Sequence, residues 1–460
     1  MEDKLVQLNY LSEVGLPGPS VRQFNVMRSP KRNGTANIDA IPYLDQLGIE
    51  IIDKRQPIQF LPNSIEPVHY WSPYVQGFSA KFVQGTLDSY RGEYTLPVIL
   101  DPFAGSGTVI VQSKLNEYES YGIELNPLLH FIAETKINTW DTCPDELLRI
   151  SRNLPQKRTY EAPYFLKSKK QFKLGVLRNL EILKSGIDSL EPATSQDKQI
   201  KDLLLLAFSA ILISCSNLKR TPCLGYSRRK VVNDNAPFEL FTQKVNEIAS
   251  DLRVLQDHYK NERSESKIYL ANSMEYKHTT MYDLVITSPP YMNGLDYVIN
   301  YKIEMSWLGF VENHKQLKRV KDEMVVCDNV SKGLIRAFAS QQERYSNDWI
   351  EEIKQNIENN IAKRGNYRRK DMPEVVHKYF DDMHKVMLRV VNALRPGGRF
   401  ILVVGDSLIA DVYLPTDLIL ARMGNEMGLT IEKIEKARNR RSGQVRSYQL
   451  RETIVTLKMD

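Results

Sequence analysis

The chain has 460 residues with a formal net charge of +6, and 42% of the residues are hydrophobic, 26% charged and 9% aromatic. These values exclude a wholly disordered chain and indicate a globular protein of two domains, or of one domain with large insertions. The mild basic excess permits a polyanionic partner without requiring one. The four cysteines have no CxxC spacing, so no zinc or redox motif is readable, and this usage suits a reducing cytoplasm.

The distribution of apolar residues along the sequence does not predict a membrane protein. The N-terminus lacks the apolar stretch of a signal peptide. The longest apolar run, residues 203–213, is too short to cross a membrane and predicts a buried helix. Residues 1–58 predict loops and short elements that form a structural extension, and an arm that contacts DNA or a partner subunit is the alternative.

A nucleotide-binding pattern begins near residue 96. Residues 96–100 predict a short strand, followed by Asp101-Pro-Phe-Ala-Gly-Ser-Gly-Thr108 and apolar residues at helical spacing. Glycines at such a turn let a ligand approach the backbone, and the helix N-terminus offers free N–H groups. The turn lacks the GK[ST] ending of a phosphate-binding loop. A second predicted strand, 120–123, ends at Glu124, where doubly wound folds place a ribose-binding carboxylate.

The chain between residues 131 and 265 predicts a mostly helical insertion that interrupts this α/β unit. Its apolar helix at 203–213 leads into a polar, basic loop at 214–230. Strand patterns return at 267–272 and at 282–286.

A second turn with chemical meaning, Thr287-Ser-Pro-Pro-Tyr291, directly follows the predicted strand at 282–286. Two consecutive prolines fix an extended turn, which holds the Ser288 hydroxyl and the neighbouring carbonyl in place as acceptors. Tyr291 can offer a flat face. A flipped base needs acceptors for its amino group and an aromatic ring to stack on, whereas an ordinary Pro-Pro loop is the alternative interpretation.

The remaining chain predicts charged helices at 311–372, an amphipathic helix at 376–394, and strands at 399–405, 429–434 and 453–457. We therefore expect an α/β fold: a central mixed sheet of about seven strands flanked by helices, with the last strand antiparallel.

The two turns, DPFAGSGT and TSPPY, resemble those of the S-adenosylmethionine-dependent amino-methyltransferases that modify DNA at cytosine N4 or adenine N6 in bacterial restriction–modification systems. The resemblance implies a Rossmann-like methyltransferase fold. It divides the chain into an extension at 1–58, a discontinuous catalytic domain at 59–130 and 266–460, and a helical insertion at 131–265 that is a candidate target-recognition region. The order of the motifs excludes a circular permutation that places catalysis first.

The resemblance also implies site residues. The residues matched to cofactor contacts are Asp101, Phe103, Gly105, Gly107, Thr108, Glu124, Asn272, Tyr74 and Lys81. The residues matched to the catalytic turn are Ser288, Pro289, Pro290 and Tyr291. The segment 69–81 resembles the family's motif near the methionine end of the cofactor, and the segments 295–309 and 395–406 fit later family motifs. Asn272 lies where the family contacts the adenine ring of the cofactor, although the acidic residue that is usual there is absent from this sequence. No metal is implied.

The implied mechanism is direct methyl transfer to an amino nitrogen, which acceptors at Ser288 and the Pro289 carbonyl hold, without a covalent intermediate. The implied partners are double-stranded DNA with a flipped base and a cognate restriction endonuclease or defence-complex subunits, in the cytoplasm of a bacterium or archaeon, associated with the nucleoid. Basic runs at 219–230, 363–370 and 436–451 favour phosphate contacts. We expect the insertion and residues 311–372 to rim a DNA cleft.

Four alternatives stay open. Serine before Pro-Pro favours cytosine N4, but adenine N6 is the other family reaction. RNA bases are an alternative substrate, and a non-catalytic, cofactor-binding subunit is another, although the intact TSPPY turn argues against the latter. Pro222-Cys223 resembles the nucleophile of cytosine-C5 enzymes, yet it lies in the insertion and not after a nucleotide-fold strand, so we expect a cysteine without a catalytic role.

Overall fold

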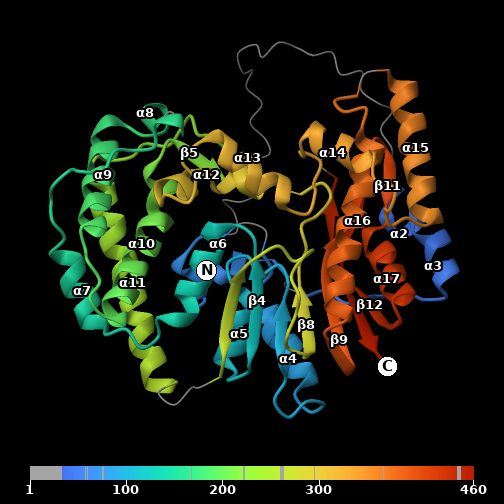
Figure 1. Ribbon diagram of the computed structural model, residues 1–460, viewed down its shortest axis with the longest axis horizontal. Coiled ribbons are helices and arrows are strands. Elements are labelled where there is room, and N and C mark those ends of the chain that lie inside the picture. Colours follow the sequence, from blue (N-terminus) through green and yellow to red (C-terminus); the bar gives the residue numbers. More distant parts are fainter. Residues whose placement is uncertain are drawn as a thin grey trace, which may run out of the picture.

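A computed structural model describes residues 34–56, 58–59, 61–74, 77–166, 168–220, 223–259, 264–294, 296–365, 367–442 and 447–460. Several features named above lie outside these ranges: residues 1–33 of the extension, Pro222, Leu295 and Arg446. The structure is a central sheet between two helical layers, with a large helical lobe on one side (Figure 1).

The seven strands that the sequence predicts all form, within one sheet. They are β3 (Ile99–Asp101), β4 (Ser120–Glu124), β7 (Ser266–Leu270), β8 (Tyr282–Thr287), β9 (Leu394–Gly405), β12 (Leu429–Arg441) and β13 (Tyr448–Met459). Their order is β7-β4-β3-β8-β9-β13-β12. The pairs from β7 to β9 are parallel, while β13 is antiparallel to both β9 and β12. The structure therefore confirms a Rossmann-like α/β sheet with an antiparallel last strand.

In the sheet, β4 and β7 lie in succession on one side of β3, whereas β8 and β9, which come later in the sequence, lie on its other side. The strand order thus reverses between β3 and β8. In open α/β sheets, a ligand crevice lies at the carboxyl ends of the strands at such a switch point.

The extension adds two strands that the sequence did not predict. β2 (Ile51–Asp53) pairs in parallel with β12, and β1 (Gly34–Thr35) pairs in parallel with β13. Between them lie the helices α2 (Ala36–Asp39) and α3 (Ile41–Leu47). Strands of two or three residues carry too little alternation to be read from a sequence.

Alternating apolar residues on the inner strands serve two separate cores. Ile99, Leu284 and Ile401 pack with one cluster, while Leu100 and Val285 pack with the other. The helices on the first face are α4 (Ala80–Tyr90), α5 (Thr108–Leu115) and α6 (Pro127–Asn138). The helices of the second face are α15 (Asp348–Arg364), α16 (Met372–Val391) and α17 (Thr416–Glu426). Because parallel strands are buried on both faces, they read as continuous apolar runs.

The insertion between β4 and β7 forms the helical lobe seen to one side of the sheet in Figure 1. Its elements after α6 are α7 (Pro144–Arg152), α8 (Ser168–Gln171), α9 (Leu174–Asp188), α10 (Ser195–Cys215), the hairpin β5 (Leu218–Arg220) and β6 (Leu224–Tyr226), and α11 (Ala236–His258). A capping box of Thr194 and Asp197 begins α10, whose apolar residues are buried. The lobe shares one continuous core with the first face of the sheet. The predicted boundary at residue 131 falls inside α6, which packs on β7.

Three helices occupy the charged segment 311–372, as predicted: α13 (His314–Glu323), α14 (Lys332–Ala339) and α15. The helix α12 (Tyr297–Trp307) precedes them, and a short hairpin, β10 (Ser407–Ile409) with β11 (Val412–Leu414), follows β9. The amphipathic helix predicted at 376–394 is α16. Within the described ranges, no helix is both long and apolar enough to span a bilayer.

Candidate active site

The carboxyl ends of β3, β4, β7 and β8 surround a narrow cavity at the switch point. Its lining includes Phe103, Gly105, Glu124, Asn272 and Ser288, so every one of the four strand ends contributes. The cavity volume is about 60 Å³. Small-molecule sites range upward from roughly 300 Å³, so a ligand of nucleoside size requires the aromatic side chains at the mouth to shift.

The glycine turn after β3 needs both of its glycines. Gly105 has φ +54° and Gly107 has φ +83°, in the left-handed region that suits glycine. A Cβ atom on Gly105 would lie 2.9 Å from the Tyr74 hydroxyl, and one on Gly107 would lie 2.9 Å from Cβ of Ala133. Gly105 thus faces the cavity, while Gly107 lets α5 begin close against α6. Thr108 is buried as the first residue of α5.

Two buried carboxylates lie at this edge of the sheet: Glu124 lines the narrow cavity, whereas Asp101, one residue before the lining residue Pro102, does not. Glu124 accepts hydrogen bonds from the backbone N–H groups of Gly105 at 2.8 Å and Asn126 at 2.7 Å. Asp101 accepts from the Thr287 hydroxyl at 2.6 Å and the Phe103 N–H at 3.0 Å, which ties β3 to β8. Burial raises the pKa of each carboxyl to about 7. Each group therefore changes its charge near neutral pH and gains from a nearby cation.

The segment predicted to lie at the methionine end of the cofactor does reach the glycine turn. Tyr74 contacts the turn and lines the narrow cavity with Tyr297. Lys136 of α6 joins the segment 69–81 to the glycine turn, because its ammonium donates to the carbonyls of His69 at 3.2 Å and Ser106 at 3.3 Å. Burial, reinforced by the charge of Lys244, lowers the Lys136 pKa to about 7.

The helical insertion also anchors this segment. Asp251 of α11 accepts hydrogen bonds from the Val68 N–H and the Trp71 indole, both at 2.8 Å, and from the Tyr70 hydroxyl at 2.7 Å. Lys81 is not brought to the site. Its side chain is 61% exposed on α4, pairs with Glu66 at 3.3 Å, and lines neither of the cavities described here.

The Ser288–Tyr291 turn is held firmly at the carboxyl end of β8. The Tyr379 hydroxyl of α16 donates to the Pro290 carbonyl at 3.0 Å. The Tyr291 hydroxyl donates to Glu452 at 2.7 Å, and the guanidinium of Arg440 lies 5.5 Å from the centre of the Tyr291 ring. Burial together with the Glu452 charge raises the Tyr291 pKa well above its usual value, so the phenol stays protonated.

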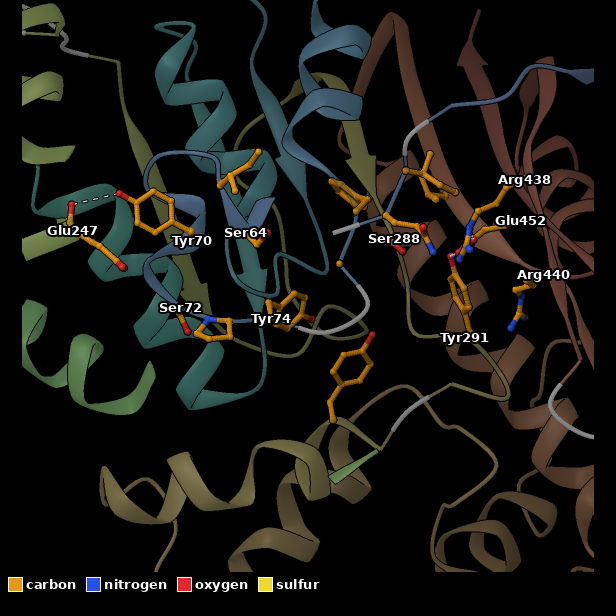
Figure 2. A pocket seen from close by; sticks show the side chains of 18 of the residues that line it. Ser64, Tyr70, Ser72, Tyr74, Glu247, Ser288, Tyr291, Arg438, Arg440 and Glu452 are labelled. Atoms are coloured by element: carbon orange, nitrogen blue, oxygen red, sulfur yellow. Dashed lines mark hydrogen bonds and ion pairs between the residues drawn. The ribbon is translucent and has the colours of Figure 1, made fainter. Parts of the chain in front are cut away.

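A second, much wider cavity of about 950 Å³ adjoins the narrow one. The two share Tyr74, Ser288 and Tyr297 in their linings. Figure 2 shows Tyr291 and the charged side chains from β12 and β13 beside Ser288 at one end of the wide cavity, and Tyr70 with residues of α11 at the other. The Ser288 hydroxyl therefore stands where two spaces of different size meet.

The wide cavity contains residues that the sequence did not single out for the site. They are Arg438, Arg440, Glu452, Tyr70, Lys244 and Glu247. Two signals in the sequence pointed to some of them: the two arginines belong to the basic run at 436–451, and Tyr70 belongs to the segment 69–81. Arg438 donates to Glu452, so both oxygens of that carboxylate are engaged. The α11 residues place the insertion on the rim, as expected. Among described residues of 311–372, by contrast, none lines the wide cavity, whereas Met324 and Val325 line the narrow one.

The described residues offer no sign of metal or cysteine chemistry. No group of three or more His, Cys, Asp and Glu side chains among them is placed to hold a metal ion. Cys223 is exposed in the insertion and lines neither cavity.

Comparisons with known proteins find methyltransferases at low sequence identity. No protein-family model matches the chain. Type II methyltransferase M.AvaI from Nostoc sp. is 24% identical over 423 residues, covering 85% of each protein. M.BsoBI from Geobacillus stearothermophilus is 23% identical over 434 residues, covering 84% of this chain and 83% of the relative. M.MvaI from Kocuria varians is 21% identical over 428 residues, covering 83% and 86%. The similarity to these Type II methyltransferases therefore extends over most of the chain and over most of each relative. A solved rRNA methyltransferase, aviRa from Streptomyces viridochromogenes, aligns with a TM-score of 0.30 and 7% identity, and this weak likeness carries no argument about the substrate.

Proposed function

We propose that this chain, a homologue of Type II methyltransferases, transfers a methyl group from S-adenosylmethionine to the exocyclic N4 of cytosine in double-stranded DNA. The observation that carries the proposal is the position of Ser288 and its rigid Pro-Pro turn between the two cavities. A methyl donor in the narrow cavity and a base in the wide one would meet at this hydroxyl.

The residues that line the narrow cavity suit the adenosine part of the cofactor, once the aromatic side chains at its mouth have shifted. The Glu124 carboxylate can accept from ribose hydroxyls, Gly105 leaves the backbone accessible, and Phe103 and Asn272 line the space for a base. The buried Asp101 and Glu124 also favour a positively charged ligand, since ionisation of both carboxyls is held back by burial. When bound, S-adenosylmethionine supplies an electrophilic methyl group on a sulfonium cation.

The catalytic turn would hold the nitrogen of the target base. The Ser288 hydroxyl and the Pro289 carbonyl accept hydrogen bonds from the amino group, which draws its lone pair out of conjugation with the ring. The turn would thereby present the nitrogen lone pair to the methyl group that S-adenosylmethionine would supply, and the nitrogen would release a proton to water. Tyr379 and Glu452 keep the turn and Tyr291 in place before the base arrives.

The wide cavity fits a flipped base and its backbone. Tyr291 offers a ring for stacking, and Arg438, Arg440 and Lys244 supply positive charge along the cavity. The assignment to cytosine rests on the resemblance of SPPY to the turn of the N4-cytosine enzymes. Adenine N6 and RNA bases are the competing substrates. A restriction endonuclease that acts on the same sites would be the natural partner, and a cytoplasmic, nucleoid-associated location follows from a DNA substrate.

The test is to incubate the protein with methyl-labelled S-adenosylmethionine and, in separate reactions, double-stranded DNA or RNA, digest the nucleic acid to nucleosides, and identify the labelled species by mass spectrometry. The control is the double variant Ser288→Ala, Tyr291→Ala, with cofactor binding measured separately. Labelled N4-methylcytosine from the wild type alone supports the proposal. Labelled N6-methyladenine would retain the mechanism and overturn the base assignment. Labelled RNA, or no label despite cofactor binding, would overturn the substrate.

A further inference from the structure

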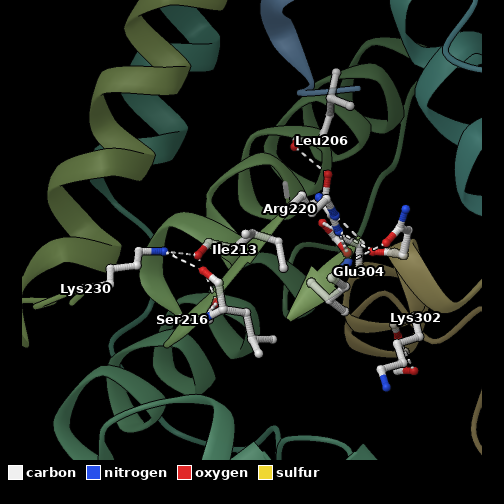
Figure 3. Close-up of polar contacts among 12 residues, drawn as sticks. Leu206, Ile213, Ser216, Arg220, Lys230, Lys302 and Glu304 are labelled. Atoms are coloured by element: carbon white, nitrogen blue, oxygen red, sulfur yellow. Dashed lines mark hydrogen bonds and ion pairs between the residues drawn. The ribbon is translucent and has the colours of Figure 1, made fainter. Parts of the chain in front are cut away.

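The hairpin β5–β6 of the insertion is fastened at both of its ends (Figure 3). At its base, the Ser216 hydroxyl accepts from the Leu218 N–H at 3.0 Å, and the Lys230 ammonium donates to the Leu218 carbonyl at 3.1 Å. Lys230 also donates to the carbonyl of Ile213 in the last turn of α10. The hairpin is therefore a rigid extension of α10.

On its other side the hairpin is joined to α12, the helix that follows the catalytic turn. The Arg220 guanidinium donates to the Asn300 carbonyl at 2.9 and 2.7 Å and to the two carboxylate oxygens of Glu304 at 2.5 and 2.6 Å. The Leu224 N–H donates to the Asn300 side chain at 2.7 Å. The side chains of Arg220 and Glu304 are only 8% and 7% exposed, so this is a buried ion pair. Figure 3 shows the guanidinium reaching from the hairpin to α12.

A row of aromatic rings continues from this ion pair to the cofactor turn. The Arg220 guanidinium lies 4.5 Å from the centre of the Tyr301 ring. Tyr301 stacks on Tyr74 with ring centres 5.8 Å apart and planes 18° apart. The Tyr74 hydroxyl lies 2.9 Å from the position that a Cβ on Gly105 would take. Three consecutive contacts thus join Arg220 of the insertion to the glycine turn.

We propose that Arg220 is a positioning residue for cofactor binding, which holds Tyr301 and, through it, Tyr74 against the Gly105 turn. The proposal rests on the function proposed above for the identity of the ligand. Because Tyr74 lines both cavities, its position decides how much room the narrow cavity offers. A cation over one face of Tyr301 fixes that ring, and stacking passes the constraint to Tyr74. The helical insertion then contributes to the cofactor site as well as to the rim of the wide cavity.

The structure contains a closely matched control for this arrangement. Arg399 also forms a two-pronged ion pair with a glutamate, Glu432, at 2.8 Å on both prongs, and its guanidinium also lies 4.5 Å from a tyrosine ring, that of Tyr90. Neither residue of this ion pair lines the narrow or the wide cavity. A general effect of losing an arginine–glutamate–tyrosine cluster should therefore appear at both places.

The experiment measures the affinity for S-adenosylhomocysteine by calorimetry, without DNA, in the wild type, in R220M/E304Q and in R399M/E432Q. Each double variant removes both charges, since removing one partner leaves a buried, unpaired charge that can prevent folding. We expect the dissociation constant to rise about tenfold in R220M/E304Q and to stay within about twofold of the wild type in R399M/E432Q. Circular dichroism and thermal unfolding check that both variants fold.

Two further variants separate the ring from the charge. Y301L, which leaves the ion pair intact, should weaken binding like R220M/E304Q, whereas Y301F, which retains the ring, should bind like the wild type. Unchanged affinity in R220M/E304Q or in Y301L overturns the proposal, as does equal weakening in R399M/E432Q. A wild type that binds no S-adenosylhomocysteine contradicts the proposed function instead, so the two failures are distinguishable.

Discussion

The two cavities that meet at Ser288 are built in different ways. The narrow one is made from backbone turns and one buried carboxylate, Glu124, at the ends of four parallel strands, within a volume of about 60 Å³. The wide one, of about 950 Å³, is lined largely by long charged and aromatic side chains, which come from the segment before α4, from α11 and from β12 and β13. Backbone turns fix one ligand shape, whereas long side chains can adapt to a larger partner. The contrast predicts that changes in the narrow cavity abolish ligand binding, and that changes around the wide one alter turnover or DNA affinity.

The largest effect is expected for Gly105→Val in the narrow cavity. Residue 105 has φ +54°, and a side chain there would collide with the Tyr74 hydroxyl. We expect the affinity for S-adenosylhomocysteine, measured by calorimetry, to fall by about 100-fold or more. Gly85→Ala, in α4 with nothing within 4 Å of the added Cβ, is the matched control and should bind normally. Normal binding by Gly105→Val would break the assignment of this cavity to the cofactor.

The next effect concerns charge in the narrow cavity. Burial raises the pKa of Glu124 and of Asp101 to about 7, so both become more ionised as the pH rises from 6 to 8. We expect affinity for the sulfonium cofactor to increase over that range and level off above it, with a weaker rise for neutral S-adenosylhomocysteine. Glu124→Gln should bind about tenfold more weakly at pH 8, since hydrogen bonds to a charged group are lost, and should show a flatter pH profile.

The same pKa shift predicts a change in stability of the free protein. A carboxyl whose folded-state pKa lies above its unfolded value of 4.5 binds its proton more tightly in the folded state, so its ionisation lowers the free energy of unfolding as the pH rises from 4.5 through 7. Glu124→Gln should therefore lose less stability between pH 5 and pH 8 than the wild type, measured by denaturant unfolding. An identical pH dependence in both proteins would show that the carboxyl is not held in its neutral form by burial.

A smaller, kinetic effect is expected at the wide cavity. Glu452→Gln weakens the support of Tyr291 and Arg438 without touching the narrow cavity. We expect kcat for DNA methylation to fall about fivefold while cofactor affinity stays unchanged, since one supporting hydrogen bond is weakened. Glu435→Gln, a buried glutamate of β12 that lines neither of these cavities, is the control. Loss of cofactor affinity in Glu452→Gln would contradict the assignment of the cofactor to the narrow cavity and of the base to the wide one.

The smallest effect is expected outside both cavities, on the basic loop of the insertion. Arg228 and Arg229 are exposed there. Replacing both with alanine should raise KM for DNA a few-fold and lower the slope of log affinity against log salt by about 2, as expected for two lost phosphate contacts. Arg149→Ala, Arg152→Ala on α7 removes two exposed charges elsewhere on the lobe and should leave the slope unchanged. Equal slopes in the two double variants would remove the loop from the DNA contact surface.

The contrast between the cavities also explains what the sequence could predict. Gly105, Glu124 and Ser288 each follow a buried strand within a few residues, so local patterns placed them and the switch point brought them together. Lys244 and Glu452 come from parts of the chain far apart, and no short pattern marks them, whereas Tyr70 lies in the segment 69–81 that the resemblance did mark. The sequence also could not show that the Lys81 side chain points away from both cavities. A short motif shows that a helix lies near the site, but it does not show which face of the helix is turned to the site. The two short strands before β3 carried too few residues to be recognised.

The most direct test is the structure of the protein with S-adenosylhomocysteine and a duplex that contains a target cytosine. We expect the adenosine to lie between Phe103, Glu124 and Asn272. The flipped base should lie against Tyr291 with its amino nitrogen within about 3.5 Å of the Ser288 hydroxyl, as a reactive arrangement requires. An adenosine bound among Arg438, Tyr70 and Lys244 in the wide cavity, or a base that remains stacked in the duplex away from Ser288, would contradict this expectation.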